Sequence, residues 1–378
     1  MGCMSLKHWY HNPDARQWRT EPPRSALAFH RSLDGYQPTS LTSLPALADE
    51  LGVGQVHAKD ESQRLGLPAF KVLGASWATC RALCERLGLE AVDMTLPRLR
   101  DHLLAALPVA ARPVLVTATD GNHGWAVARV AALLGLAARV YIPTGVSENA
   151  VSGIRGEGAE LVALDRTYDE VIEAAAEAAA NSETDLLIQD TAWEGYVDIP
   201  RWIVEGYGTL FREIDDAMAA YELPGPHLVA CPVGVGSFAH AMVDHYRSPD
   251  GDPPALLSVE PETAACIAES LVAAHPVSVD TSYPSIMTGL NCGTPSGLGW
   301  PSLLAGLDAA VSVTEDECRQ AVRDLTALGQ VAGPCGAATL AGVRKVLADS
   351  SRREQLGITR SSVLVLLITE GLAANPLR

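Results

Sequence analysis

The sequence predicts an α/β fold in which helices cover both faces of parallel sheets, and three observations lead to it. Short apolar runs alternate along the chain with longer stretches rich in Ala and Leu, which is the order of strands connected by helices. The runs are almost continuously apolar, as in parallel strands that are buried on both faces. With 378 residues, of which 48% are apolar, the chain is long enough to form two lobes.

The predicted strands are seven apolar runs, at residues 113–119, 138–143, 159–164, 185–190, 227–233, 255–260 and 362–369. Two of the Ala-rich stretches between them, 124–136 and 168–182, are predicted helices. The Gly- and Pro-rich segment 289–302 is longer than a simple connection requires and is a candidate functional loop.

Composition narrows the class of partner. The formal net charge of −17 disfavours nucleic acid and anionic membranes, because no segment supplies the basic stripe that they require. We therefore expect a small-molecule partner. The opening residues contain no apolar stretch that could serve as a signal peptide, which predicts a cytoplasmic protein. The eight cysteines and ten histidines show no metal-site spacing, so we expect free thiols and no metal.

Lys71 lies in the apolar stretch LPAFKVLGASWA and is the first candidate for chemistry. Burial among residues such as Phe70 and Val72 disfavours the charged form of an amine and would lower its pKa. A neutral lysine can attack an aldehyde to form a Schiff base, and it can later remove a proton from carbon. The alternative is a surface lysine whose alkyl chain alone is buried.

The segment TATDGNHGWAVA, residues 117–128, joins a predicted strand to a predicted helix. Gly121, Asn122 and His123 lie where that helix begins, and the N–H groups of a helix N-terminus bind carboxylates or phosphates. Asp120 is the unusual member of this segment. It is either an N-cap of the helix or a functional acid.

A second glycine-rich turn lies in VACPVGVGSFAHAMV. Gly234, Gly236 and Ala239 match the GxGxxA fingerprint of dinucleotide-binding proteins. Glu260 ends the next predicted strand, about where such a fold keeps the acid that binds ribose. A nicotinamide-dependent dehydrogenase would explain these residues by themselves.

The same turn would hold a phosphate monoester through the N–H groups of Val235, Gly236 and Ser237. Pyridoxal phosphate combines such a phosphate with an aldehyde for Lys71, and its ring nitrogen could pair with Thr369 at the end of the last predicted strand. A dehydrogenase would leave Lys71 without a role. The residues therefore favour pyridoxal phosphate as the cofactor.

Taken together, the motifs resemble the diaminopropionate ammonia-lyases, a family of fold-type II (tryptophan synthase β-like) pyridoxal-phosphate enzymes. They are AFKVLGAS, TATDGNHG, QDTAWEGY, GVGS, SIMTGLNCGTPS and LLITEG, and they span the chain from about residue 35 to its end. The resemblance implies a two-lobed α/β enzyme and a homodimer. We expect a large cofactor-binding domain at residues 1–71 and 201–378, and a small mobile domain at residues 72–200.

The resemblance also implies roles for the candidate residues. Lys71 is the Schiff-base lysine, and Asp120 and Asp190 are two catalytic aspartates. Residues 121–123 hold the substrate carboxylate and a cofactor oxygen, and residues 234–237 bind the cofactor phosphate. The implied reaction eliminates ammonia from 2,3-diaminopropionate and leaves aminoacrylate, which hydrolyses to pyruvate and a second ammonia. Carboxylates suit this reaction because an amine is a poor leaving group unless it departs protonated.

The chain departs from the family pattern at several positions. Pro334 and Cys335 stand where the family has an acid and a hydroxyl, and Trp125 stands where arginine is common. Two alternatives to the lyase therefore remain open. One is another fold-type II activity on a less polar amino acid, either serine or threonine dehydration or β-replacement. The other is a protein that binds pyridoxal phosphate with little turnover.

Overall fold

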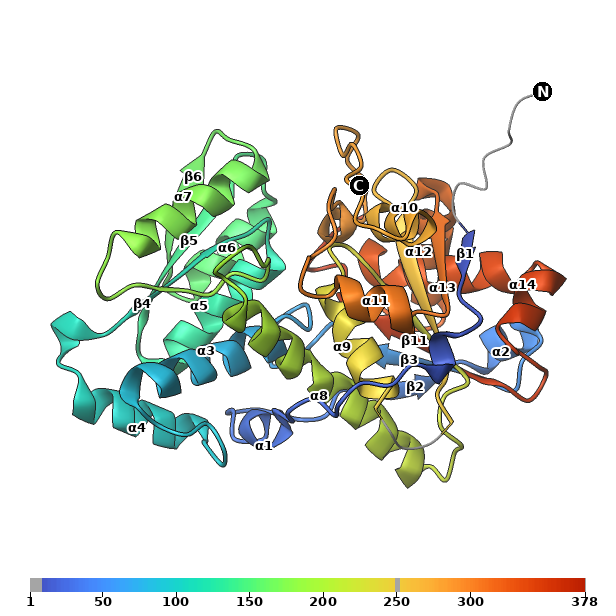
Figure 1. Ribbon diagram of the computed structural model, residues 1–378, viewed down its shortest axis with the longest axis horizontal. Helices are drawn as coiled ribbons and strands as arrows, with labels where there is room; N and C mark the ends of the chain where they lie inside the picture. Colours follow the sequence, from blue (N-terminus) through green and yellow to red (C-terminus); the bar gives the residue numbers. More distant parts are fainter. Residues whose placement is uncertain (1–8, 249–251, 378) are drawn as a thin grey trace. The chain divides into compact units, whose positions relative to one another are not determined.

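The computed structural model describes residues 9–248 and 252–377 and divides the chain into two compact units. Unit 1 comprises Met1–Pro23, Thr39–Gln63 and Leu210–Arg378, and unit 2 comprises Arg24–Pro38 and Arg64–Thr209. Each unit is built around its own sheet (Figure 1). In the part of the chain that the structure describes, every helix is too short or too polar to cross a membrane.

Unit 1 contains a seven-stranded sheet in the order β1-β10-β9-β8-β11-β3-β2. Its five inner strands are parallel, and the edge strands β1 and β2 are antiparallel to their neighbours. The strands are β1 (Trp9–His11), β2 (Leu41–Ser43), β3 (Gln55–Asp60), β8 (Leu228–Pro232), β9 (Ala255–Pro261), β10 (Ala309–Val313) and β11 (Val363–Ile368). The helices are η1 (Ala15–Gln17), α2 (Pro45–Leu51), α9 (Ser237–Tyr246), α10 (Cys266–Ala273), η3 (Thr288–Leu290), α11 (Trp300–Gly306), α12 (Glu315–Ala327), α13 (Pro334–Leu347) and α14 (Ser350–Gln355).

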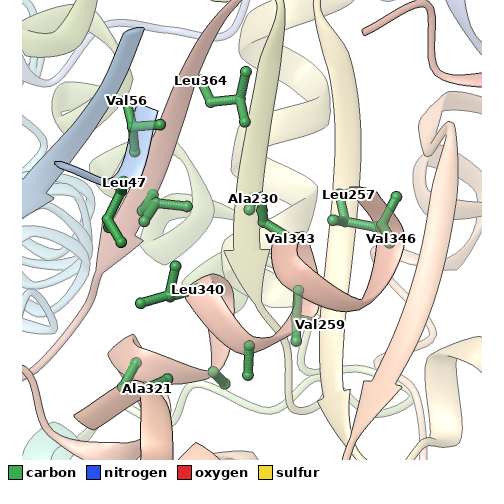
Figure 2. Close-up of a cluster of buried hydrophobic side chains, with 14 of the residues drawn as sticks. Leu47, Val56, Ala230, Leu257, Val259, Ala321, Leu340, Val343, Val346 and Leu364 are labelled. Carbon is green, nitrogen blue, oxygen red and sulfur yellow. The ribbon is translucent and has the colours of Figure 1, made fainter. Parts of the chain in front are cut away.

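Helix α13 lies against this sheet and is buried along most of its length. Small residues permit the close approach, because a Cβ at Gly342 would lie 2.5 Å from Val259 of β9 and one at Gly336 would lie 3.0 Å from the Ile368 backbone of β11. Figure 2 shows the resulting core, in which Leu340 and Val343 of α13 pack among apolar side chains of the strands. Burial of these side chains is the main term that stabilises unit 1.

Unit 2 contains a four-stranded parallel sheet in the order β6-β5-β4-β7. Its strands are β4 (Val114–Ala118), β5 (Ala137–Pro143), β6 (Glu160–Leu164) and β7 (Leu186–Leu187). Its helices are α1 (Leu27–His30), α3 (Val72–Leu87), α4 (Leu96–Ala106), η2 (Val109–Ala111), α5 (Asn122–Leu134), α6 (Glu148–Gly156) and α7 (Tyr168–Ala180). Helix α8 (Asp198–Ala220) crosses the boundary between the units.

The unit boundaries differ from the predicted domain boundaries. Residues 24–38, 64–71 and 201–209 belong to unit 2 rather than to unit 1. The physical reason is local, since residues 64–71 lead directly into α3, which packs on α5. Lys71 therefore belongs to the same unit as Asp190. The assignment of a large cofactor-binding domain and a small mobile domain stays a prediction.

Candidate functional site

Lys71 directly precedes helix α3, and its side chain makes no capping hydrogen bond. Its Nζ atom instead donates to Oδ2 of Asp190 at 2.9 Å. The rings of Phe70 and Tyr207 also face this atom, with centroids 5.7 and 5.9 Å from Nζ. The ammonium thus lies among two aromatic rings and one carboxylate, an arrangement that stabilises a cation.

The predicted low pKa of Lys71 is wrong for the protein without its cofactor. Burial does act to lower the pKa, but the charges of Asp190 and Tyr207 outweigh it, and the pKa lies well above its ordinary value. The sequence argument considered the apolar neighbours of Lys71 in the chain and could not include a carboxylate 119 residues away. Lys71 must therefore lose a proton before it can act as a nucleophile.

Asp190 is a charged carboxylate in this arrangement. Burial acts to raise its pKa, but His123 and Lys71 outweigh burial and hold the pKa well below its usual range. His123 Nδ1 lies 3.8 Å from Asp190 Oδ2. Lys71, His123 and Asp190, which are distant in sequence, thus come together in unit 2 as the resemblance implies.

His123 has one ring nitrogen available for a ligand. Its Nε2 lies 2.8 Å from the carbonyl of Ile188, which can only accept, so Nε2 carries the proton. Burial lowers the pKa of His123, which leaves the ring neutral and Nδ1 an acceptor. His123 is 4% exposed, and Nδ1 has no hydrogen-bond partner among the described residues. A buried acceptor of this kind suits a donor group of a bound ligand.

The turn between β4 and α5 is held by a side chain. The hydroxyl of Thr119 accepts from the N–H groups of Gly121 and Gly124, at 2.9 and 3.0 Å. Asp120 is exposed, and helix α5 has Gly121 as its N-cap with no side-chain cap, so Asp120 is not a helix cap. The charge of Asp120 adds to those that raise the pKa of Lys71.

The corresponding turn of unit 1, between β8 and α9, is held by its backbone. Gly236 has a left-handed φ of 101°, a conformation that favours glycine. A Cβ at Gly234 would lie 2.9 Å from Sγ of Cys292. Among the described residues, no acceptor bonds to the N–H groups of Val235, Gly236 or Ser237. Unpaired N–H groups at the start of a helix can bind a phosphate, and this role of the turn stays a prediction.

Glu260 excludes the dehydrogenase interpretation. Its carboxylate is fully buried and accepts from the N–H groups of Ile267 and Ala268, both at 2.8 Å, at the start of α10. Burial raises its pKa to about 8. A dinucleotide-binding fold would present this acid to ribose. Here the acid instead bonds to the N–H groups at the start of helix α10.

The remaining predicted residues have clear structural positions. Thr369 is buried at the end of β11, next to Glu370. Pro334 begins α13, and the N–H of Cys335 donates to Glu370 Oε1 at 3.3 Å. The carboxylate of Glu370, which belongs to the LLITEG motif, thus bonds to one of the two substituted residues.

Trp125 has a structural role on α5. Its Nε1 donates to Glu157 at 3.3 Å, and a Cβ at Gly153 of α6 would lie 2.4 Å from the indole ring. Arg129, one helical turn further on, makes two hydrogen bonds to Glu157, each 2.7 Å. The arginine that the family places after the DGNHG motif is therefore replaced by a residue that packs α6 on α5.

Two residues of the QDTAWEGY motif, Gln189 and Tyr196, support Asp190, although the sequence analysis assigned them no catalytic or binding role. Gln189 is buried and donates to Oδ1 of Asp190 at 3.3 Å. The hydroxyl of Tyr196 accepts from the Gln189 N–H and donates to the Leu187 carbonyl, both at 2.9 Å, so it holds the segment before Asp190. The signal in the sequence was a polar residue at the end of an apolar run, where a parallel strand presents side chains to a site.

The comparisons with known proteins agree with this geometry. A family model described as pyridoxal-phosphate dependent enzyme matches residues 33–369. Diaminopropionate ammonia-lyase of Escherichia coli K12 is 34% identical over 360 residues, which cover 92% of this chain and 87% of that protein. The crystal structure of the holo form of the Escherichia coli enzyme superposes with a TM-score of 0.84 at 32% identity, covering 97% of this chain and 93% of the other.

A second solved structure is the Escherichia coli enzyme in complex with an aminoacrylate-PLP azomethine reaction intermediate. It superposes with a TM-score of 0.82 at 30% identity and covers 97% of this chain and 94% of the other. The match extends over both units and all the motifs discussed above. The chain belongs to the diaminopropionate ammonia-lyase family of fold-type II pyridoxal-phosphate-dependent enzymes.

Proposed function

We propose that the protein is an ammonia-lyase that uses pyridoxal phosphate to eliminate ammonia from 2,3-diaminopropionate, giving pyruvate and ammonia. The observation that carries the proposal is the contact of 2.9 Å between Lys71 Nζ and Asp190 Oδ2. It places an amine for the cofactor next to a carboxylate for a cationic substrate. The relative with a bound aminoacrylate intermediate supports the same reaction.

The chain has the groups that the cofactor requires. Lys71 would attach to its aldehyde, Val235, Gly236 and Ser237 would hold its phosphate through their N–H groups, and the Thr369 hydroxyl would pair with its ring nitrogen. When bound, the cofactor supplies an electron-withdrawing ring that acidifies the Cα proton and permits loss of the β-substituent. The unpaired N–H groups of the β8–α9 turn fit the phosphate without any change in the backbone.

The acids and bases of unit 2 would then divide the proton transfers. Lys71, once neutral, or Asp120 removes the proton from Cα, and Asp190 binds the β-ammonium of the substrate and keeps it protonated until it leaves. His123 Nδ1 accepts a hydrogen bond from the substrate, as its buried and neutral state permits. Residues 121–122 hold the carboxylate.

The wider setting follows from the family. We expect a homodimer in the cytoplasm, with residues 1–71 and 201–378 as the cofactor-binding domain and residues 72–200 as a small domain that closes on the substrate. A molecular mass in solution above that of the monomer would support the homodimer.

The experiment is an assay of purified holoenzyme with each isomer of 2,3-diaminopropionate and with serine and threonine. Ammonia and the 2-oxoacid are measured together, and Lys71→Ala loaded with cofactor is the control. We expect two molecules of ammonia for each pyruvate from diaminopropionate, and at least ten times slower turnover of serine, because the neutral hydroxyl gains little from Asp190. Faster release of ammonia from serine or threonine would show that the protein is a dehydratase and not this lyase.

A further inference from the structure

The side chain of Gln189 makes three hydrogen bonds, one of which goes to Asp190. Its side chain is fully buried. Its Oε1 atom accepts from the N–H of Ala118 at 2.9 Å and from the hydroxyl of Thr117 at 3.2 Å, and its Nε2 atom donates to Asp190 Oδ1. One amide therefore joins the end of β4 to Asp190.

The orientation of this amide is determined by its partners. The backbone N–H of Ala118 can only donate, so the carbonyl oxygen of Gln189 must face β4. The NH₂ group then faces Asp190, whose charged carboxylate can only accept. Gln189 is the one uncharged side chain of this length that satisfies both neighbours at once.

Gln189 also explains why the predicted strand at 185–190 ends early. The ladder between β4 and β7 pairs Leu115 with Leu186 and Val116 with Leu187, and its last bond runs from the Ile188 N–H to the Val116 carbonyl at 2.8 Å. The next donor of β4, the Ala118 N–H, bonds to the side chain of Gln189 instead of the backbone. The main chain is thus released from the sheet immediately before Asp190.

We propose that Gln189 is a positioning residue that fixes Oδ1 of Asp190, so that Oδ2 faces Lys71 and the substrate. The two oxygens have separate partners, since Oδ1 bonds to Gln189 while Oδ2 lies 2.9 Å from Lys71 Nζ and 3.8 Å from His123 Nδ1. A carboxylate held at one oxygen cannot rotate, and the other oxygen keeps a fixed place at the reacting atoms. The inference rests on the proposed catalytic role of Asp190.

The first test uses the apoprotein and does not depend on turnover. Lys71 is one of four lysines in the sequence, so its labelling by acetic anhydride can be followed on its peptide by mass spectrometry. Only the neutral amine reacts, so the rate of labelling at a fixed pH of about 9 reports how strongly Lys71 holds its proton. The titratable groups that act on it are Asp190, Tyr207, Asp120 and His123.

In Gln189→Met, which keeps length but removes both hydrogen-bonding groups, we expect the labelling rate to rise about tenfold, because Asp190 no longer holds the ammonium. Thr117→Val is the matched control, since it removes a hydrogen bond to the same oxygen and leaves the donor to Asp190 intact. Its labelling rate should stay at the wild-type value. Equal rates in Gln189→Met and wild type would make Gln189 a structural link only.

The second test uses the holoenzyme and a second variant. Gln189→Glu keeps the acceptor for Ala118 but replaces the donor to Asp190 Oδ1 by a carboxylate, which repels that oxygen. We expect kcat at neutral pH to fall about tenfold with KM within threefold, because Oδ2 loses its fixed place. This variant decides the question if Gln189→Met does not fold. A kcat within twofold of the wild-type value would overturn the proposal.

The two proposals fail in different ways. If the wild-type holoenzyme releases no ammonia from diaminopropionate, the proposed function is wrong, and the apoprotein labelling still decides whether Gln189 positions Asp190. If the wild type is active but both variants match it in labelling rate and kcat, only the positioning role is wrong.

Discussion

Two turns of this protein join the same kinds of element but differ in how their backbone N–H groups are bonded. Each joins the end of a parallel strand to the start of a helix, β4 to α5 in unit 2 and β8 to α9 in unit 1. In the first, the Thr119 hydroxyl bonds to the N–H groups of Gly121 and Gly124. In the second, the N–H groups of residues 235–237 have no partner within the described chain.

The difference shows how one backbone geometry serves two functions. In the first turn, the Thr119 hydroxyl bonds to two of the N–H groups and fixes the backbone that presents acids and bases such as Asp120 and His123. A turn whose N–H groups are unpaired remains an anion site. The glycines of the two turns look alike in sequence, and the residue that separates them is a threonine.

The largest expected effect is at Lys71, which belongs to unit 2 together with the first turn. Lys71→Ala should lower turnover on 2,3-diaminopropionate by about 10³-fold or more, because the protein loses the amine that holds the cofactor and moves the proton. The visible absorption of the holoenzyme should be lost, and borohydride should no longer fix the cofactor to the chain. Lys345→Ala, which removes a surface partner of Glu317, is the control and should keep full activity.

The next effect concerns the two aspartates near the first turn. Asp190→Asn and Asp120→Asn keep shape but remove a charge, so each should lower kcat about 10²-fold while the cofactor stays bound. Each variant should be assayed on both isomers of diaminopropionate, since a base reaches the Cα proton from one face only. Full ammonia release by both variants on both isomers would show that the carboxylates are structural.

Replacing a glycine by alanine should have different effects in the two turns. Gly236→Ala strains a residue with φ of 101° and places a Cβ 2.6 Å from Leu303 Cδ1. We expect about tenfold weaker binding of pyridoxal phosphate, or about 1.4 kcal/mol, measured by titration of the apoprotein. Gly124→Ala instead brings a Cβ to 2.3 Å from Thr119 Cγ2 and should mainly lower the stability of unit 2.

Gly225→Ala is the matched control, because a Cβ there meets no atom within 4 Å and the residue is not left-handed. It should leave both cofactor affinity and melting temperature at their wild-type values. If Gly236→Ala binds the cofactor as tightly as Gly225→Ala does, the second turn is not the phosphate site.

The smallest effect on function is expected at Glu260. Its pKa is about 8 in the folded chain and near 4.5 when exposed, so its contribution to stability is complete below about pH 4.5 and is lost as the pH rises to 8. Glu260→Gln cannot ionise, so its melting temperature should depend less on pH across this window. Cofactor affinity should change less than about twofold. A large loss of cofactor affinity would return Glu260 to the binding site.

Most of the parallel core could be predicted, because its strands are continuous apolar runs. All seven predicted strands are present, whereas two inner strands, β3 and β10, were missed. In β3, His57 and Lys59 interrupt the apolar pattern. Lys59 is buried because its Nζ donates to Glu213 at 2.6 Å, a residue 154 positions away. A pairing over that separation leaves no periodic signal in either segment.

The site was predictable in its residue types and not in its electrostatics. The motifs brought Lys71, Asp190 and the glycine turns to attention, and the structure places Lys71 beside Asp190 as the resemblance implies. The state of the amine was mispredicted because it depends on that distant carboxylate. Gln189 was missed for a related reason, since its role depends on which strand its amide reaches.

The position of β11 has a consequence for how the chain is made. It is the last strand in the described chain, yet it lies in the middle of the seven-stranded sheet, between β8 and β3. During synthesis, about 300 residues are added after β3 before its neighbour β11 is made, whereas β4 to β7 follow one another within a short segment. The sheet of unit 2 can therefore form on the ribosome, and any chain that stops before residue 363 leaves two apolar strand edges open to aggregation.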